Sequence, residues 1–595
     1  MTTIAEKKEL RKGGSFLIQE TQASEVFVPE DLTEEQKMIQ AMAREFVSNH
    51  TNEKGHFLDH QVDLMKMAGE LGLLGAHFPE HYGGMGLETN TNTVIGEEIG
   101  KGGGSFNTTF AAHTGIGMLP ILYFGTKVQK NTYLPKLASG DWLAAYCLTE
   151  PGSGSDALAA KTRADLSEDK QHYIINGQKM WISNAGFADI FIVFAQIDGD
   201  KFTGFIVDAH SNGITLGEEE EKMGIKGSST RQVFFENVMV PVNAVLGEVG
   251  RGHLIAFNAL NIGRFKLGNM CMGGCKTASS VSVQYANERV QFKRSISSFG
   301  AIKYKLAQQA IQIYVLESAV YRVSDLLQRK KNALTDGGLD LETAMLQSAE
   351  EYAIECACIK VAGSEYLEQV IDEMVQIHGG YGYSEEYPAA RAYRDQRINR
   401  IYEGTNEINR MLMVNMLFKR AMNGSIDMVN PAWEVQKALT KMPSLNKPEG
   451  LFGQELKSLQ DFKNLALMVL GAAAKMQMDG QIDLKEEQEI LMNGADLLIE
   501  IFMTESLLLR MVRLSNSPRL APPEVYEAIL RTHFHDTNAR MAKFSTDALA
   551  SFASGDLLKT FLMGVKRFTS YPAVNVKENR RMIADYLIAK NSYAL

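Results

Sequence analysis

The chain has 595 residues, far more than a single hydrophobic core holds, so several domains are expected. Hydrophobic residues make up 45% of it and charged residues 22%, which is typical of a soluble globular protein. Its 71 acidic and 61 basic residues give a net charge of -10. This balance argues against nucleic acid as a partner, because non-specific nucleic-acid binding needs clustered Lys and Arg.

The cysteines and the N-terminus indicate a reducing compartment. Five cysteines are a small and odd number for a chain of this length, so a disulfide framework is not expected. The pairs Cys271/Cys275 and Cys356/Cys358 have no His at finger-like spacing, so we expect small buried side chains and no metal site. Residues 1–16 resemble neither a secretory signal nor a transit peptide. We therefore expect a cytoplasmic protein, with a peripheral position at the inner membrane face as the alternative.

Hydrophobic periodicity divides the chain into helical and strand-like regions. Residues 31–35 read as a helix start, with acidic residues in the first turn. Residues 173–182 are expected to form two strands joined by a turn at Asn176-Gly177. The expected regions are an N-terminal arm (1–30), an N-terminal helical domain (31–142), a central β-domain (143–253), a helical bundle domain (254–422), a connector (423–453) and a helical extension domain (454–595).

Two stretches of the expected β-domain are candidates for ligand contact. Residues 145–156 leave a strand and enter a loop of Gly and small hydroxyl residues, whose backbone N–H groups can approach an anionic or carbonyl-rich ligand. Trp181 and Ser183 lie two apart on a strand, so a flat ring system can pack on Trp181 while Ser183 binds its edge. A plain surface turn and a half-buried core Trp are the respective alternatives. The glycine-rich segments 100–105 and 152–155 match neither a P-loop nor a dinucleotide fingerprint.

Two stretches of the expected bundle complete the functional signal. Residues 378–383 are rich in glycine, which indicates either a close backbone approach or a turn that ends a helix. Glu403 lies between Tyr402 and Gly404, with the apolar Ile401 nearby. A carboxylate removed from water has a raised pKa and can act as a base. A helix-capping Glu is the alternative.

In wording and order, these four stretches resemble the acyl-CoA dehydrogenase family across nearly the whole chain. Residues 221–226, 258–265 and 288–292 match it too, and the C-terminal extension resembles that of the very-long-chain branch, which is shared with a paralogue that also acts in assembling a respiratory complex. The resemblance implies a mainly α fold with a central β-domain: a helical N-terminal domain, a β-barrel and a four-helix bundle, followed here by a C-terminal helical domain. One departure is Lys293, where relatives commonly have Gly after the Phe of an Arg-x-x-Phe motif.

The resemblance also implies FAD as the cofactor and an acyl-CoA as the substrate, which Ser155, Arg264 and Gly404 would contact. An FAD site shared between subunits implies at least a homodimer. One FAD would lie against Tyr146, Leu148, Thr149, Gly154, Ser155, Trp181, Ser183, Thr405 and Glu407, and the FAD of the neighbouring subunit would be contacted by Arg289, Phe292, Gln376, Gly379 and Gly380.

Glu403 holds the place of the catalytic base in this resemblance. It would abstract the α proton of the thioester while the β hydrogen leaves as hydride to flavin N5, which gives a trans-2-enoyl-CoA and passes electrons to electron-transfer flavoprotein. Some relatives place the base just before Arg264 instead, where this chain has Gly263, which cannot act. An acyl-CoA oxidase that uses oxygen and a binding or assembly protein that retains the fold are the alternatives.

Acyl-chain length and membrane contact depend on weaker patterns. Small residues within 110–117 favour a deep pocket and a long acyl chain over simple close packing of helices. No apolar run approaches the roughly 20 residues of a membrane span. A weak membrane contact is one interpretation of a basic and apolar pattern in the connector, and a solvated surface helix is the one we favour. That pattern consists of Lys437, Lys441 and Lys447 near Trp433, Leu439 and Met442.

Overall fold

The chain divides into two compact units, each built from several stretches of sequence. The structure, a computed structural model, describes residues 10–439, 441, 448–517 and 519–595. The sheet unit comprises Leu32–Ser282 and Gly363–Thr405. The helical unit comprises the residues up to Asp31, together with Val283–Ala362 and Asn406–Leu595. The division falls inside two long helices, α8 (Gly252–Glu288) and α11 (Ala353–His378).

Helices make up the first part of the sheet unit. The first helix starts where the sequence predicts, because the Thr33 hydroxyl accepts the Gln36 N–H at 3.2 Å and the Gln36 side chain accepts the Thr33 N–H at 3.0 Å. A Ser or Thr cap of this kind contributes about 1 kcal/mol to stability. The elements are α1 (Glu34–Phe46), η4 (Val47–Thr51), α2 (Asn52–Lys54), α3 (Gln61–Glu70), α4 (Thr89–Gly100), α5 (Gly104–Ala111), η7 (Ala112–Gly117), α6 (Leu119–Phe124) and α7 (Lys127–Ala138).

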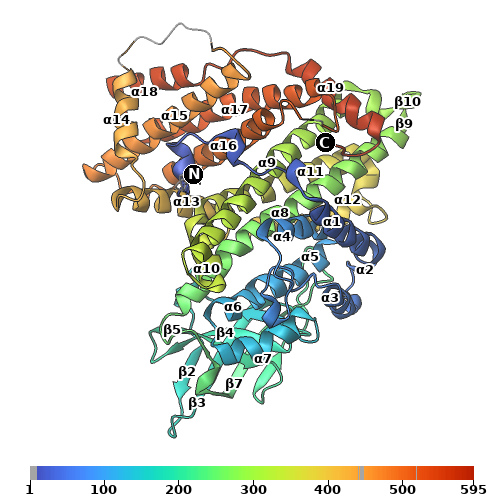
Figure 1. The fold of residues 1–595 in the computed structure, drawn as a ribbon, viewed down its shortest axis with the longest axis vertical. Helices are drawn as coiled ribbons and strands as arrows, with labels where there is room; N and C mark the ends of the chain where they lie inside the picture. The colour runs from blue at the N-terminus through green and yellow to red at the C-terminus, as the bar shows by residue number, and fades with distance from the viewer. Residues whose placement is uncertain (1–9, 440, 442–447, 518) are drawn as a thin grey trace, which may run out of the picture. The chain divides into compact units, whose positions relative to one another are not determined.

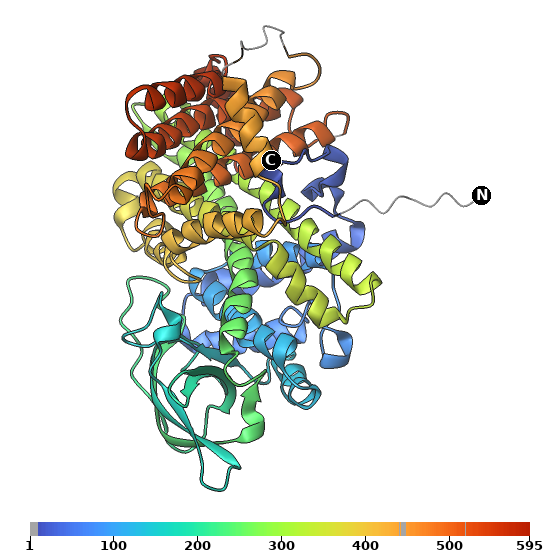
Figure 2. The ribbon, with the colours of Figure 1, turned by 90° about the vertical axis from the view of Figure 1, so that its left-hand side faces the viewer.

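A mostly antiparallel sheet follows within residues 144–246 (Figures 1 and 2). Its strands run in the order β6-β7-β3-β2-β4-β5-β8, and β1 pairs in parallel with β4. The strands curl around an apolar interior in which Phe191, Val193 and Phe205 are fully buried (Figure 2). The strands are β1 (Ala144–Cys147), β2 (Arg163–Leu166), β3 (His172–Ser183), β4 (Ile190–Ile197), β5 (Lys201–Asp208), β6 (Ile214–Leu216), β7 (Thr230–Pro241) and β8 (Val245–Leu246).

The prediction of a turn at Asn176-Gly177 is wrong, because these two residues lie inside a single strand, β3. The two residues form an irregularity in the pairing of β3 with β7. Asn176 Oδ1 accepts the N–H of Asn237 on β7 at 2.8 Å. A Cβ at position 177 would come within 2.4 Å of Thr162 Oγ1, so glycine is needed here for the close approach of a neighbouring segment.

Long helices dominate the helical unit, and α15, α16 and α17 pack on one another (Figure 1). The stretch predicted as a connector, 423–453, contains the helix α14, while Met442 and Lys447 of the predicted basic pattern lie outside the described residues. The helices are α9 (Gly300–Asp336), α10 (Leu341–Glu351), α13 (Asn406–Met422), α14 (Val429–Leu439), α15 (Gly453–Met478), α16 (Gln488–Arg513), α17 (Pro523–Phe552), α18 (Gly555–Phe568) and α19 (Val576–Lys590).

The N-terminal arm is an integral part of the helical unit from residue 10 onward. Val26 and Val28 are buried against Leu509 and Leu514 at the end of α16. Two arginines of the same helix end bind the arm's acidic residues: Arg510 contacts Glu30 at 2.7 Å and Arg513 contacts Asp31 at 3.0 Å. The arm therefore owes its order to packing and ion pairs with residues almost five hundred positions later, as the separation of 480 between Glu30 and Arg510 shows.

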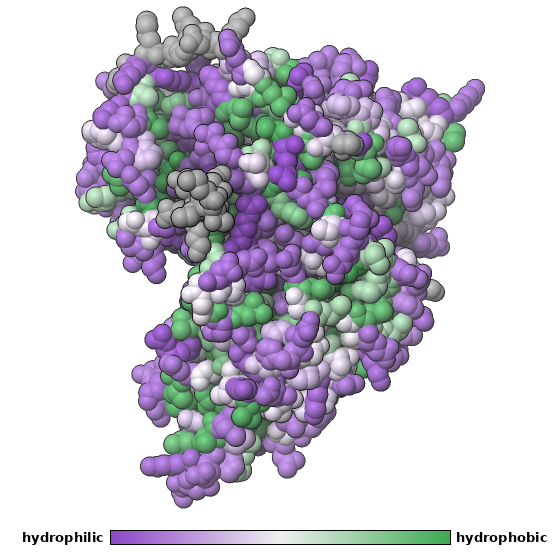
Figure 3. All heavy atoms as spheres, in the orientation of Figure 1, coloured by the Kyte–Doolittle hydropathy of each residue, from purple (hydrophilic) through white to green (hydrophobic). Residues whose placement is uncertain are grey.

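The face drawn in Figure 3 is mostly hydrophilic, and hydrophobic residues lie there in small groups. This distribution agrees with the charged content of 22% and with cores that take up most of the large apolar side chains. Among the described residues, no helix combines the length and the hydropathy that a bilayer span requires.

Candidate active site

The loop that follows β1 is tied to the middle of β3. Thr149 O accepts the N–H of Met180 at 2.9 Å, and Leu148 O accepts a hydrogen bond from Lys179 Nζ at 3.2 Å. These contacts bring the predicted site residues Leu148 and Thr149 beside Trp181. The predicted loop after a strand is therefore present, and it is held to the second predicted stretch.

A buried ion pair fixes this loop. Lys179 Nζ lies 2.7 Å from Glu150 Oε1, and both side chains are almost fully buried. Glu150 also accepts the backbone N–H groups of Lys161 and Thr162 at 2.6 and 3.0 Å. Burial works to raise the pKa of Glu150, but Lys179 and these hydrogen bonds outweigh it and lower the pKa. Glu150 thus stays ionised and anchors the turn that carries Gly154 and Ser155.

Trp181 and Ser183 lie on β3 on either side of the buried Ile182, as the alternation of a strand predicts. Trp181 has a positive φ of 57° and is 60% exposed, which is unusual for so large an apolar ring. The register of β3 with β7 shifts between Lys179 and Ile182, and this irregularity turns the ring outward. A ring presented in this way offers a flat surface to a ligand.

Tyr146 of β1 is buried with its ring edge-on to Phe194, at 5.1 Å between centroids. Its hydroxyl is buried and has no hydrogen-bond partner among the described residues. Burial and the nearby charge of Glu403 raise the pKa of Tyr146 well above its usual value. The hydroxyl is therefore a neutral group with unused hydrogen-bonding capacity close to Glu403.

Glu403 stands in a strained backbone conformation. Its φ is 58°, and that of Gly404 is 79°. A non-glycine residue in the left-handed region costs on the order of 1–3 kcal/mol and persists only where the surroundings impose it. Arg264 is buried on α8 and donates from Nε towards Glu403 O at 3.4 Å, while its Nη1 donates to Asn261 Oδ1 at 2.8 Å.

The Glu403 carboxylate packs directly against Gly263. A Cβ built at position 263 would lie 2.5 Å from Glu403 Oε2 and 2.9 Å from Cδ, so a side chain there would require the carboxylate to move from its observed position. Oε2 is buried. Ile401, the apolar residue near Glu403 in the sequence, is 49% exposed and contributes little shielding. The shielding comes from α8 and from Tyr146 on β1.

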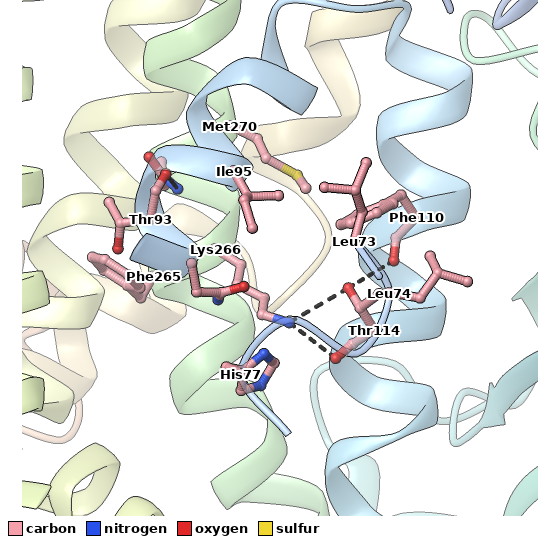
Figure 4. A pocket seen from close by; sticks show the side chains of 13 residues that line it. Leu73, Leu74, His77, Thr93, Ile95, Phe110, Thr114, Phe265, Lys266 and Met270 are labelled. Carbon is pink, nitrogen blue, oxygen red and sulfur yellow. Dashed lines mark hydrogen bonds between the residues drawn. The ribbon is translucent and has the colours of Figure 1, made fainter. Parts of the chain in front are cut away.

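Lys266 lies one helical turn after Gly263 on α8. Its Nζ donates to Thr114 O at 2.9 Å, as Figure 4 shows. Burial lowers the pKa of Lys266 to about 7, while the charge of Glu403 acts in the opposite direction. The charges of Lys266 and Glu403 therefore interact across a poorly solvated space.

The remaining predicted residues fall into two groups. Gln376, Gly379 and Gly380 are exposed in the sheet unit, at the end of α11 and in the turn η11 (Gly379–Tyr383), and Thr405 is the last residue of that unit. Glu407, in the first turn of α13, belongs to the helical unit, as do Arg289 and Phe292, which follow α8.

Phe292 and Lys293 form the tip of a hairpin between β9 (Val290–Gln291) and β10 (Arg294–Ser295). Their φ values are 51° and 66°, the positive pair that a tight hairpin turn requires. Glycine adopts this conformation without strain, whereas Lys293 adopts it at some cost in free energy. Lys293 keeps the turn and presents Phe292 at 87% exposure.

Comparisons with known proteins agree with this geometry. The family descriptions "Acyl-CoA dehydrogenase, N-terminal domain", "middle domain" and "C-terminal domain" match residues 33–141, 145–238 and 250–418, and a further "Acyl-CoA dehydrogenase, C-terminal domain" matches residues 461–567. A "Probable acyl-CoA dehydrogenase" of Bacillus subtilis (strain 168) is 41% identical over 596 residues, which cover 99% of each chain. The chain belongs to the acyl-CoA dehydrogenase family.

Two solved acyl-CoA dehydrogenases and one human enzyme illustrate the range of the similarity. A Bacillus anthracis acyl-CoA dehydrogenase complexed with FAD matches at a TM-score of 0.94 and 42% identity, covering 98% of this chain and 100% of that one. Butyryl-CoA dehydrogenase from Megasphaera elsdenii matches 65% of this chain and 99% of its own, at a TM-score of 0.59 and 34% identity. The mitochondrial very long-chain specific acyl-CoA dehydrogenase of Homo sapiens is 42% identical over 353 residues, or 58% of this chain and 51% of that protein.

Membership in this family confirms the predicted fold class, the class of enzyme and FAD as its cofactor. The residues of this acyl-CoA dehydrogenase fit such a group. A Cβ at Gly152, Gly154, Gly379 or Gly380 would meet no heavy atom within 4 Å, so the backbone there is open to close approach. The exposed Trp181 ring and the unpartnered Tyr146 hydroxyl add a flat apolar surface and a polar contact.

Sequence reasoning missed two residues of this acyl-CoA dehydrogenase site. Lys179 is buried although it stands in a strand with polar neighbours, and Lys266 stands between the apolar residues Phe265 and Leu267 of α8. For Lys266, the available signal is its spacing from Gly263, because residues three apart share a helix face. The partners of both lysines lie far away in sequence, 29 residues for Glu150 and 152 for Thr114.

Proposed function

We propose that the protein catalyses the α,β-dehydrogenation of an acyl-CoA thioester to the trans-2-enoyl-CoA, with Glu403 as the base. The observation that carries this proposal is the Glu403 carboxylate, held by a strained backbone against Gly263 and shielded by α8. Glu403 is half-buried and its Oε2 is fully buried. A carboxylate that is partly removed from water is a stronger base than one on the surface, and removal of a hydrogen next to a thioester carbonyl needs such a base.

The chain's own residues account for the proton chemistry. The α C–H bond breaks and its proton passes to the Glu403 carboxylate, while the carbon–carbon double bond forms as the β hydrogen leaves with its electron pair. The backbone at Glu403 and Gly404 binds the thioester oxygen, where negative charge develops, and Arg264 steadies this backbone through Glu403 O. The chemistry that FAD supplies when bound is acceptance of the two electrons as a hydride.

The FAD site of the proposal combines three surfaces. Leu148, Thr149, Gly154 and Ser155 supply backbone and hydroxyl contacts, with Ser155 also near the CoA part of the substrate. Trp181 and Ser183 contact the ring, and Tyr146 lies near it. Thr405 and Glu407 return to the same FAD, and Arg289, Phe292, Gln376, Gly379 and Gly380 contact that of the neighbouring subunit in a homodimer.

A long acyl chain and electron-transfer flavoprotein are the proposed substrate and acceptor. Two features support the long chain: the small residues Ala112, Gly115 and Gly117 in η7, and the similarity to very long-chain specific dehydrogenases. The acceptor follows from the proposed class of dehydrogenase and distinguishes it from an oxidase, which would form peroxide.

Anaerobic titration of the FAD-loaded protein with acyl-CoAs of increasing length tests the function. We expect the flavin absorbance to bleach with long acyl-CoAs, and we expect Glu403→Gln to retain FAD but lose bleaching. A loaded wild-type protein that no acyl-CoA bleaches would contradict the proposed substrate class. Rapid peroxide formation in air, without need of electron-transfer flavoprotein, would favour the oxidase.

A further inference from the structure

Lys266, one helical turn after Gly263 on α8, lines a narrow cavity (Figure 4). Leu73, Leu74, Ile95, Phe110 and Met270 make up its apolar wall, which suits an acyl chain. Lys266 and Asn269 of α8 also line the cavity, and these polar residues do not suit an acyl chain. They are three residues apart, so their side chains stand next to each other on one face of the helix.

Lys266 has hydrogen-bonding capacity beyond its present contacts. Its Nζ donates to Thr114 O at 2.9 Å and lies 3.4 Å from Thr114 Oγ1, a long contact to a hydroxyl that itself donates to Phe110 O at 2.9 Å. An ammonium group has three donors. The protonated form therefore has at least one N–H left over, on a side chain that is partly buried.

Asn269 has the complementary capacity. Its Nδ2 donates to Thr93 O at 2.9 Å, which fixes the orientation of the amide. Its Oδ1 is buried and has no partner among the described residues. Buried acceptors without partners are rare in proteins and often mark the place of a water molecule or a ligand.

One donor and one acceptor that line the same narrow cavity fit a group that can both accept and donate. A hydroxyl does this, since its oxygen accepts from Lys266 Nζ while its hydrogen is donated to Asn269 Oδ1. A carboxylate can only accept and would face Asn269 Oδ1 unfavourably. The cavity of about 20 Å³ has room for one group of the size of water, which matches a single oxygen rather than a larger polar head.

We propose that Lys266 and Asn269 are specificity-determining residues that recognise a hydroxyl on the acyl chain of the substrate, beyond the β carbon. The inference rests on the proposed function, because it takes this cavity as part of the acyl-binding region beside Glu403. A bound water occupies the position in the free enzyme, and the substrate hydroxyl replaces it with both hydrogen bonds kept. A plain acyl chain has no group that fits this small cavity, so it leaves the water in place, gains nothing there and binds less well.

The test compares acyl-CoAs of one chain length that carry either no substituent or a single hydroxyl at successive carbons beyond the β carbon. Affinity for the FAD-loaded enzyme is measured by calorimetry, and anaerobic flavin bleaching is followed in parallel. We expect one hydroxylated isomer to bind at least about tenfold more tightly than the plain chain. Lys266→Met should reduce the ratio of the two affinities to about one, and Lys266→Gln should keep part of the difference through its amide N–H. The surface variant Lys201→Met should leave the ratio unchanged.

The outcomes separate the two proposals. If the plain chain binds and bleaches as well as every hydroxylated isomer, with the same ratio in Lys266→Met, the position holds only water and the inference is overturned while the proposed function stands. If no acyl-CoA binds or bleaches the wild-type enzyme, both are overturned. Because the readout is a ratio between two ligands on one protein, a general loss of stability in a variant does not imitate the expected result.

Discussion

At the scale of single residues, the site depends on one pair of positions, Glu403 and Gly263. The sequence was sufficient to nominate Glu403 as the base and to note that position 263 could not act. It did not indicate that the two touch, since they are 140 positions apart and only the fold brings the carboxylate within 2.5 Å of a Cβ built on Gly263. The contact explains why a side chain is absent there.

The first prediction concerns this contact. Gly263→Ala should push the Glu403 carboxylate aside and lower kcat by about 10²-fold or more, with FAD content unchanged, since a displaced base loses its reach to the α proton. Moving the carboxylate to position 263 should also be possible. Glu403→Gly combined with Gly263→Glu should recover part of the activity that Glu403→Gly loses. Stopped-flow flavin reduction measures both. Normal activity in Gly263→Ala would contradict the placement of the carboxylate.

Lys266 marks the limit of residue-scale prediction from the sequence. Nothing in its immediate neighbours signals that this side chain lines a narrow cavity, because its partner Thr114 lies 152 residues away on another element. The same holds for the hydroxyl of Tyr146, because Glu403, whose charge acts on it, lies 257 residues later in the chain.

At the scale of elements, the loop after β1 depends on the Lys179–Glu150 pair. Lys179→Met should leave the buried Glu150 charge without its partner and destabilise the sheet unit by about 3–5 kcal/mol, with weaker FAD retention. The double variant Lys179→Met/Glu150→Gln removes that charge and should be the more stable of the two. Urea unfolding and flavin content measure both effects. A double variant less stable than the single one would show that the pair does not anchor the loop.

The N-terminal arm offers an element-scale prediction on pH. Glu355 of α11 accepts the N–H of Gly14 at 2.6 Å, and burial raises its pKa from 4.5 to about 7. Between these values the folded state binds more protons than the unfolded state, so the free energy of unfolding falls as pH rises from about 4.5 to about 7. Glu355→Gln keeps an acceptor without the charge and should lose this part of the pH dependence. Unfolding at pH 5 and pH 8 compares the slopes, and equal slopes in both proteins would refute the assignment.

Element types were largely predictable and their exact course was less so. Capping residues gave the start of α1 correctly, because capping is local. The Asn176-Gly177 pair looked like a hairpin turn, but a tertiary contact, the approach of Thr162 just before β2, accompanies an irregularity within β3 instead. Local chemistry alone could not distinguish these two uses of the same dipeptide.

At the scale of the whole molecule, the units were beyond prediction because each combines distant stretches of the chain. The helical unit joins the arm to α16 through pairs such as Arg510–Glu30, and no local pattern reports such a contact. The sequential domains predicted from composition therefore remain a proposal about the order of regions along the chain, while the observed units describe which regions pack together.

The proposed homodimer gives a prediction at this scale. Phe292→Ala should weaken FAD retention by the neighbouring subunit, whereas Glu403→Gln should inactivate its own. In a mixed dimer of the two variants, one site would combine an intact Glu403 with an intact Phe292 from the partner. Co-expression should therefore restore up to about half of the wild-type activity per dimer, where each variant alone has little. No restoration in purified mixed dimers would contradict the shared site.

The most direct test of the central claim is exchange of the α hydrogens. A 3-thia acyl-CoA, whose β position holds sulfur and cannot release hydride, is bound to the FAD-loaded enzyme in D₂O, and loss of the α-proton signal is followed by NMR. We predict that the wild type exchanges these hydrogens and that Glu403→Gln, with the same affinity for the ligand, slows exchange by about 10²–10⁴-fold. Equal exchange in the two proteins would show that Glu403 is not the base.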